Sequence, residues 1–184
     1  GGVMRTRIDA RDRLIVALDV ASAAEAEALV DRMGDQVRFV KVGLELYTVA
    51  GPEIVRRLVD RGKRVFLDLK FLDIEETVRR ATARVAAMGA TFLTIHANRK
   101  ALIAAVQGRG QSDLKLLAVT VLTNFDGNDL RDMGIQRSVR DLVTARAMLA
   151  AETGCDGVVA SGAEPEAIRA KVGPNLLIVT PGVR

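Results

Sequence analysis

The stretch from Val65 to Ile74 reads VFLDLKFLDI. Its apolar beginning predicts a buried strand, and strand alternation places Asp68 and Lys70 on the same face of it. Asp73 follows three residues later, where the chain is expected to turn into a helix. Burying a charge without a partner is costly. Three charges in this setting therefore indicate either a structural ion pair that closes the strand or an active site.

Six further apolar runs of similar length accompany this stretch. The expected strands are residues 14–19, 37–42, 65–69, 91–95, 114–122, 157–160 and 176–180. Helices are expected between them at residues 22–33, 52–61, 74–88, 100–107, 139–152 and 164–172, with a short helical piece in the loop 124–133. The strands are continuously apolar rather than alternating, which is typical of parallel strands covered on both faces.

Repeated strand–helix units fit either an open doubly wound sheet or a (β/α)8 barrel. The first strand–helix turn, Asp19 to Ser22, contains no glycine, which disfavours a dinucleotide-binding fold. Seven units favour the barrel, as a single α/β domain over residues 1–184. The chain is expected to end after strand seven, with the last strand–helix unit of the barrel missing. Residues 1–4 are set aside as an untidy or non-native start.

Polar residues recur at the carboxyl ends of the expected strands. They are Asp19, Lys41, Asp68 with Lys70, His96, Thr123, Ser161 and Arg184. In a barrel these ends meet at one mouth, which is where active sites lie. A structural ion pair at one strand would not predict this convergence, so the pattern favours an active site.

The composition argues against several classes of protein. The net charge is only +4, and the Lys and Arg residues are scattered along expected helices, so nucleic acid binding is not indicated. One His and one Cys cannot form a usual zinc site or a disulfide. No membrane-length apolar run or signal peptide is apparent, and the protein is expected to be cytoplasmic.

Asp19, Lys41, Asp68, Lys70 and Asp73 would form an array of alternating charges. Such an array keeps each group ionised. A protonated lysine is a poor Schiff-base nucleophile, but it can stabilise negative charge on carbon and then donate a proton there. Carboxylates could also bind Mg²⁺, although the two lysines would repel it. The residues alone therefore predict a cofactor-free lyase or proton-transfer enzyme that acts on a small anion.

Residues 68–73 match the D-x-K-x-x-D signature of the orotidine 5′-monophosphate decarboxylase superfamily, and the chain resembles its bacterial decarboxylases. Further stretches resemble the family in order, namely 14–19, 41–46, 94–97, 119–123, 156–159 and 180–184. Relatives that use Mg²⁺ usually carry a glutamate where this chain has Lys41. The resemblance therefore implies metal-free conversion of orotidine 5′-monophosphate to UMP and CO2 in pyrimidine biosynthesis. A Mg²⁺-dependent sugar-phosphate lyase and a non-catalytic barrel that binds a phosphate ligand are the alternatives.

The resemblance also implies roles for individual residues. Lys70 would protonate C6 of the pyrimidine, Asp68 would lie against the substrate carboxylate, and Lys41 would bridge the charges and the ribose. A homodimer with shared active sites is implied, with no metal or cofactor. Asp73 is the fourth implied catalytic residue and would reach the neighbouring subunit's pocket. The other implied substrate-binding residues are Asp19 at the ribose, Ile74 and Thr77 beside Asp73, Thr123 at the pyrimidine and Arg184 in a closing loop.

The chain departs from the family pattern at Leu72, at Glu75-Glu76 and at residues 98–100, none of which alters the four charges of Lys41, Asp68, Lys70 and Asp73. His96 and Ser161 are expected to support the substrate-contacting residues without touching the substrate themselves. Family members also continue for one more strand–helix pair that grips the phosphate, so the natural protein is expected to be longer.

Overall fold

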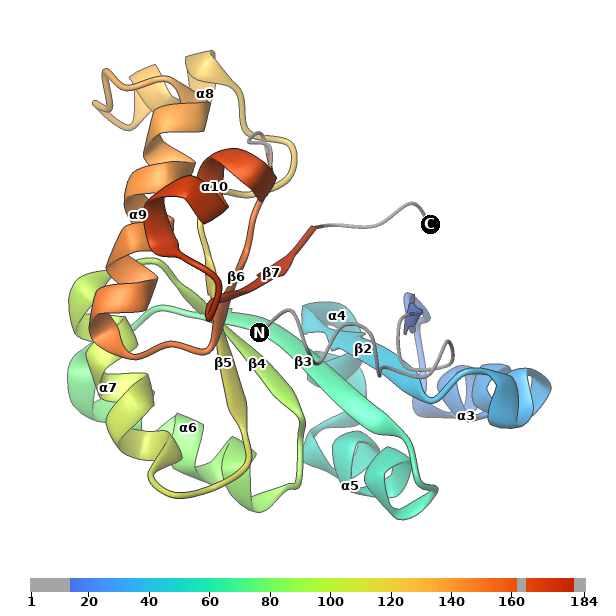
Figure 1. The fold of residues 1–184 in the computed structure, drawn as a ribbon. Coiled ribbons are helices and arrows are strands. Elements are labelled where there is room, and N and C mark those ends of the chain that lie inside the picture. Colours follow the sequence, from blue (N-terminus) through green and yellow to red (C-terminus); the bar gives the residue numbers. More distant parts are fainter. Residues whose placement is uncertain (1–13, 162–164, 181–184) are drawn as a thin grey trace.

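The computed structural model describes residues 14–161 and 165–180 of the chain. Its centre is a seven-stranded sheet in which each strand pairs in parallel with the next strand in sequence. The sheet curves, and the helices lie along its outer side (Figure 1). The strands are β1 (Ile15–Ala17), β2 (Phe39–Gly43), β3 (Arg64–Phe71), β4 (Phe92–His96), β5 (Lys115–Val119), β6 (Gly157–Val159) and β7 (Leu177–Val179).

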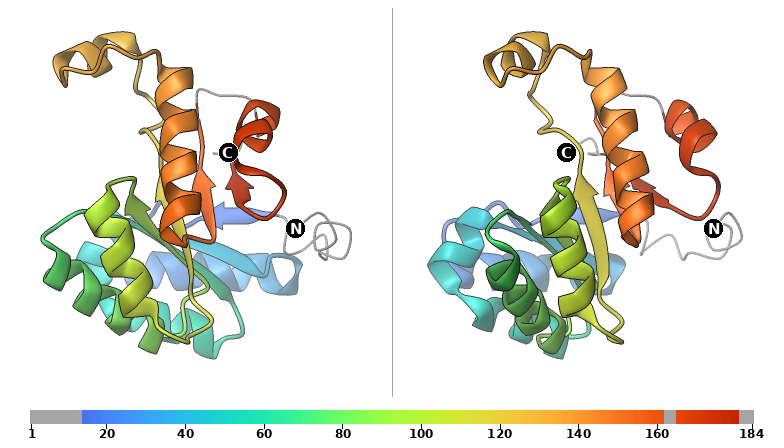
Figure 2. Two further views of the ribbon diagram at one scale, coloured as in Figure 1. Left: turned by 60° about the vertical axis from the view of Figure 1, so that its left-hand side comes forward. Right: turned by 90° about the vertical axis from the view of Figure 1, so that its left-hand side faces the viewer.

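The helices connect the strands on the outside of the curve. They are α3 (Ala23–Met33), α4 (Leu44–Ala50), α5 (Pro52–Asp60), α6 (Glu75–Ala87), α7 (Arg99–Arg109), α8 (Gly127–Asp132), α9 (Val139–Thr153) and α10 (Pro165–Val172), with a 3₁₀ turn at Gly34–Gln36. The two further views confirm that they follow the outer side of the sheet, and that α8 lies beyond one end of α9 (Figure 2). The Ser22 hydroxyl accepts a hydrogen bond from the Glu25 amide at 3.1 Å and so caps the N-terminus of α3.

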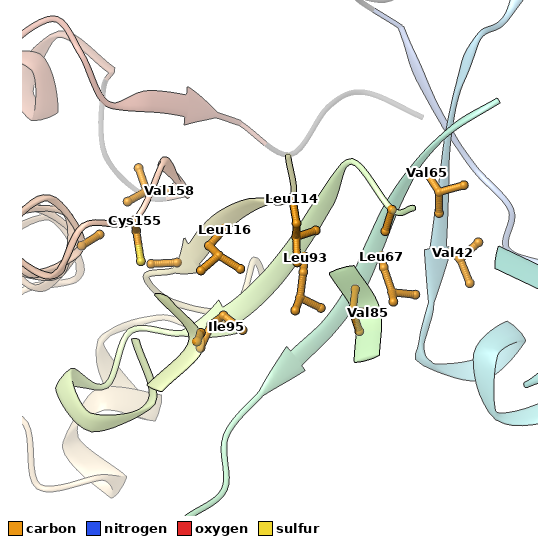
Figure 3. Packing of buried hydrophobic residues seen from close by; sticks show 14 of the residues in the cluster. Val42, Val65, Leu67, Val85, Leu93, Ile95, Leu114, Leu116, Cys155 and Val158 are labelled. Carbon is orange, nitrogen blue, oxygen red and sulfur yellow. The ribbon is translucent and has the colours of Figure 1, made fainter. Parts of the chain in front are cut away.

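The core has two parts, one on each side of the sheet. The larger part fills the space between the sheet and the helices, where Val42, Leu67 and Leu93 from three strands meet Val85 of α6 (Figure 3). The smaller part lies on the inner side and contains the buried Phe39, Phe66 and Leu117. Phe92 packs against both phenylalanines of this cluster, with ring centroids 5.5 and 5.7 Å away. Burial on both sides explains why the strands are continuously apolar in sequence.

All seven predicted strands are present, with boundaries that differ by a few residues. Helix α4 was not predicted, because residues 41–46 were interpreted only as the end of a strand and a family motif. No helix in the described part of the chain is long and apolar enough to cross a membrane. Residues 1–4 and Arg184, for which predictions were made, lie outside the described residues.

Candidate active site

Three of the predicted charged residues meet at the carboxyl ends of β2 and β3. The Lys70 ammonium lies 3.0 Å from each carboxylate oxygen of Asp68. The Lys41 ammonium approaches the same carboxylate from β2, with Nζ 3.7 Å from Oδ2. The Asp68 side chain is only 14% exposed, whereas those of Lys41 and Lys70 are 28% and 37% exposed. One largely buried carboxylate is thus held between two more accessible ammonium groups, so three of the five residues of the predicted array, Lys41, Asp68 and Lys70, lie together.

The backbone reaches this arrangement through an irregularity in β3. Leu67 pairs with Leu93, but the next pair is Phe71 with Ile95, so Asp68, Leu69 and Lys70 together lie opposite a single β4 residue. Lys70 has φ 51° and is the only described non-glycine residue with a positive φ. Such a conformation is strained for an L-residue and is typical of functional sites. The sequence correctly predicted that Asp68 and Lys70 meet, but regular strand alternation is not the reason.

Thr94 is the β4 residue opposite this irregularity, and it is fully buried. Its hydroxyl donates to Asp68 Oδ1 at 2.8 Å and accepts the Lys70 backbone N–H at 3.0 Å. Thr94 was not among the site residues predicted from the sequence. The available signal was a hydroxyl inside an apolar strand, two residues before His96 and therefore on the same face as that residue.

Burial and nearby cations lower the pKa of His96 at the end of β4. Desolvation is the main cause, and the charges of Lys70 and Arg146 add to it. Arg146, on α9, is half-buried, and its guanidinium donates to the backbone carbonyl of Thr120 at 2.7 Å. Burial lowers the pKa of Arg146 as well. His96 is therefore a neutral ring at neutral pH beside two cationic groups, and Arg146 is a neighbour that the sequence analysis missed.

Comparisons with known proteins show which family the chain resembles. The model of the orotidine 5'-phosphate decarboxylase / HUMPS family matches residues 12–184. The chain belongs to this family. The resemblance inferred from residues 68–73 is thereby confirmed, and the charge cluster lies within the matched part of the chain.

Curated relatives and a solved structure of the family show how close the likeness is. The orotidine 5'-phosphate decarboxylase of Nitrobacter winogradskyi is 52% identical over 175 residues, which cover 95% of this chain and 73% of that protein. That of Methylobacterium radiotolerans is 51% identical over 176 residues, covering 96% and 76%. The crystal structure of orotidine 5'-phosphate decarboxylase from Lactobacillus acidophilus superposes with a TM-score of 0.84 at 34% identity, over 93% of this chain and 81% of that one. This match and the seven parallel strands confirm the predicted barrel class.

Three other residues predicted from the family pattern lie on the exposed segment after β3. Asp73 accepts a hydrogen bond from the backbone amide of Ile74 at 2.7 Å, and no ion pair joins it to Lys41 or Lys70 within the described residues. The Ile74 side chain is 72% exposed, and Thr77 is also exposed, on α6. Within the described contacts, Asp73 therefore stands apart from Lys41, Asp68 and Lys70.

The remaining predicted residues follow other strands of the family fold. Asp19 comes two residues after β1 and Thr123 lies beyond β5, and both are exposed. Ser161 follows β6, and its hydroxyl is buried without a hydrogen-bond partner in the described part of the chain. Arg184 lies outside the described residues. Among the residues described, no three His, Cys, Asp or Glu side chains gather closely enough to hold a metal ion.

Proposed function

We propose that this family member decarboxylates orotidine 5′-monophosphate to UMP and CO2 in pyrimidine biosynthesis. The observation that carries the proposal is the contact of Asp68 with both Lys41 and Lys70 at the mouth end of the strands. Active sites of barrel enzymes lie at this end. The names of the relatives support the choice of substrate, and Lys41 stands where relatives that use Mg²⁺ usually carry glutamate.

The cluster can carry out each step of the reaction without a cofactor. A substrate carboxylate placed beside Asp68 is repelled, and that repulsion is relieved as CO2 leaves. The electron pair of the broken carbon–carbon bond stays on C6, where the Lys70 ammonium stabilises it. A proton then passes from Lys70 Nζ to C6, which gives UMP. Because Asp68 already holds Lys70 Nζ at 3.0 Å from both of its oxygens, the donor needs little reorganisation.

Other residues bind the non-reacting parts of the nucleotide in this proposal. Lys41 and Asp19 bind the ribose hydroxyls, Thr123 contacts the pyrimidine, and Arg184 belongs to a loop that closes over the ligand. Asp19 and Thr123 follow β1 and β5, and Lys41 lies within β2 beside Asp68, which supports these roles. The role of Arg184 rests on the family resemblance alone. The single, buried cysteine and a nucleotide substrate suit the cytoplasm.

A homodimer with shared active sites is the second part of the proposal. Leu72 and Ile74, which flank Asp73, are 58% and 72% exposed, and Leu44 and Val49 of α4 are 66% and 58% exposed. These large apolar side chains lie on the segments that directly follow the neighbouring strands β2 and β3, and exposed apolar surface of this kind marks interfaces. Covering them with a second copy would bring Asp73, Ile74 and Thr77 to the partner's pocket.

An ultraviolet assay of orotidine 5′-monophosphate loss in excess EDTA tests the activity. Full turnover with the chelator is expected. Lys70→Ala should lower kcat by roughly 10²–10⁴-fold or more, because it removes the proton donor. Lys100→Ala is the matched control, because the Lys100 side chain is 80% exposed and its ammonium lies 3.8 Å from a Glu75 carboxylate oxygen, so this variant should retain full kcat. Strict Mg²⁺ dependence with no orotidylate turnover would instead favour the sugar-phosphate lyase.

Mixed dimers test the shared site. Lys70→Ala and Asp73→Ala subunits should each be inactive alone. After subunit exchange, up to about a quarter of wild-type activity should return, because half of randomly formed dimers are hybrids with one intact pocket of two. If verified exchange restores nothing, Asp73 does not act in the partner's pocket.

A further inference from the structure

We propose that Thr94 is a positioning residue, which fixes both the Asp68 carboxylate and the Lys70 backbone in their reactive arrangement. This inference rests on the proposed function, because it assigns Thr94 a part in that reaction. Thr94 has no accessible surface, so it acts through the two residues that it holds. Its position in the middle of β4, beside β3 in the sheet, gives it a rigid base (Figure 1).

The first contact supports the backbone of Lys70. Three β3 residues lie opposite Thr94 alone, so the regular pattern of strand pairing is interrupted there. The Lys70 N–H donates to the Thr94 hydroxyl at 3.0 Å within this interruption. A buried amide without an acceptor is costly. The hydroxyl thus stabilises a segment in which Lys70 has the strained φ of 51°.

The second contact orients the carboxylate. Thr94 Oγ1 lies 2.8 Å from Asp68 Oδ1, and Lys70 Nζ lies 3.0 Å from the same oxygen. The Thr94 hydroxyl has one hydrogen to donate. It accepts a hydrogen bond from the Lys70 N–H, so its own hydrogen is donated to the Asp68 carboxylate. Thr94 therefore limits rotation of the Asp68 side chain, and through Asp68 it limits where the ammonium of Lys70 lies.

Thr94 forms both contacts with one hydroxyl, so two substitutions separate the effect of the hydroxyl from the effect of the side-chain volume. Thr94→Ser keeps the hydroxyl and loses a methyl group. Thr94→Val keeps the volume and loses both hydrogen bonds. Thr82→Val is the matched control, because Thr82 is also fully buried, but its hydroxyl has no hydrogen-bond partner among the described residues.

The test compares kcat, KM and melting temperature for the wild type and these variants. Thr94→Val is expected to lower kcat about 10- to 100-fold, the size of effect that loss of a hydrogen bond to a charged group gives. KM should change by less than about threefold, because binding the nucleotide does not require the reactive alignment. Thr94→Ser should recover most of kcat, and Thr82→Val should keep all of it. Thr94→Ala replaces Thr94→Val if the latter does not fold.

Different results overturn different statements. No orotidylate turnover by the wild type would remove the proposed function, and the role of Thr94 with it. Wild-type turnover together with an unchanged kcat in folded Thr94→Val would overturn the role of Thr94 alone. The role of Thr94 is also overturned if Thr94→Val has a lower melting temperature but an unchanged kcat. It is overturned as well if the kcat of Thr94→Ser is as low as that of Thr94→Val, because the hydroxyl would then have no part in positioning.

Discussion

Replacing Lys70 by glycine and, separately, by alanine removes the same ammonium group but treats the backbone differently. At φ 51° the residue is in the left-handed region, which costs an L-residue roughly 1–2 kcal/mol and glycine almost nothing. Glycine's extra freedom in the unfolded chain costs roughly 0.5–1 kcal/mol in the opposite direction. We therefore expect the free energy of unfolding of Lys70→Gly to be about 0.5–1 kcal/mol higher than that of Lys70→Ala. For a chain of this size, that corresponds to a melting temperature about 1–4 °C higher.

Urea unfolding followed by far-ultraviolet circular dichroism measures this difference directly. Arg84 provides the control pair, because it is exposed on α6 and has ordinary helical surroundings. There alanine should be more stable than glycine by about 0.5–1 kcal/mol. The order of the two substitutions is thus expected to reverse between the sites. If Lys70→Ala is more stable than Lys70→Gly by the same margin as alanine over glycine at Arg84, the strain assigned to Lys70 does not exist in solution.

Three further predictions concern stability and reactivity. Gly157→Ala should lower the free energy of unfolding by about 1–3 kcal/mol. The added Cβ would lie 2.6 Å from the Cβ and the carbonyl oxygen of Leu177 and 2.8 Å from Cδ2 of Leu117. An unchanged urea midpoint would contradict this close packing. His96 is the only histidine, and its pKa is lowered from 6.5 in the folded protein. Below pH 6.5 the unfolded chain binds a proton at this histidine that the folded protein binds only at lower pH, so the free energy of unfolding should fall as the pH drops below 6.5. His96→Asn should lack this part of the pH dependence. An identical pH profile of stability in that variant would refute the prediction. Burial raises the pKa of the Cys155 thiol to about 11, so a disulfide reagent should label one thiol quickly only after unfolding, and fast labelling of the native protein would show that Cys155 is accessible.

The strand pattern and the charge cluster could be predicted because each depends on simple properties of the sequence. Continuous apolar runs indicate parallel strands with two covered faces, and the buried residues on both sides of the sheet explain that pattern. Asp68 and Lys70 stood out because charges rarely follow such a strand without a partner. The seven strands and the approach of Lys41 to Asp68 followed from these rules.

The local backbone of the site could not be predicted in the same way. Nothing in residues 67–71 marks the irregularity in β3, because no glycine stands at the left-handed position that Lys70 occupies. In this conformation the Lys70 amide donates to the hydroxyl of Thr94, a residue 24 positions away in the chain. Helix α4 was missed for a related reason, since its seven residues are too few to show clear periodicity. The role of Asp73 stays a prediction, because it concerns a second subunit.

The strand order has a consequence for how the protein forms during synthesis. Each described strand pairs only with its immediate neighbours in sequence. Paired residues in the described sheet are at most 40 positions apart, as in Leu117 with Gly157, so each pairing closes a loop of moderate length. Each strand–helix unit can add to the edge of the sheet soon after the ribosome releases it. Lys41 and Asp68 come from the second and third strands, so their contact can form while most of the chain has yet to be made.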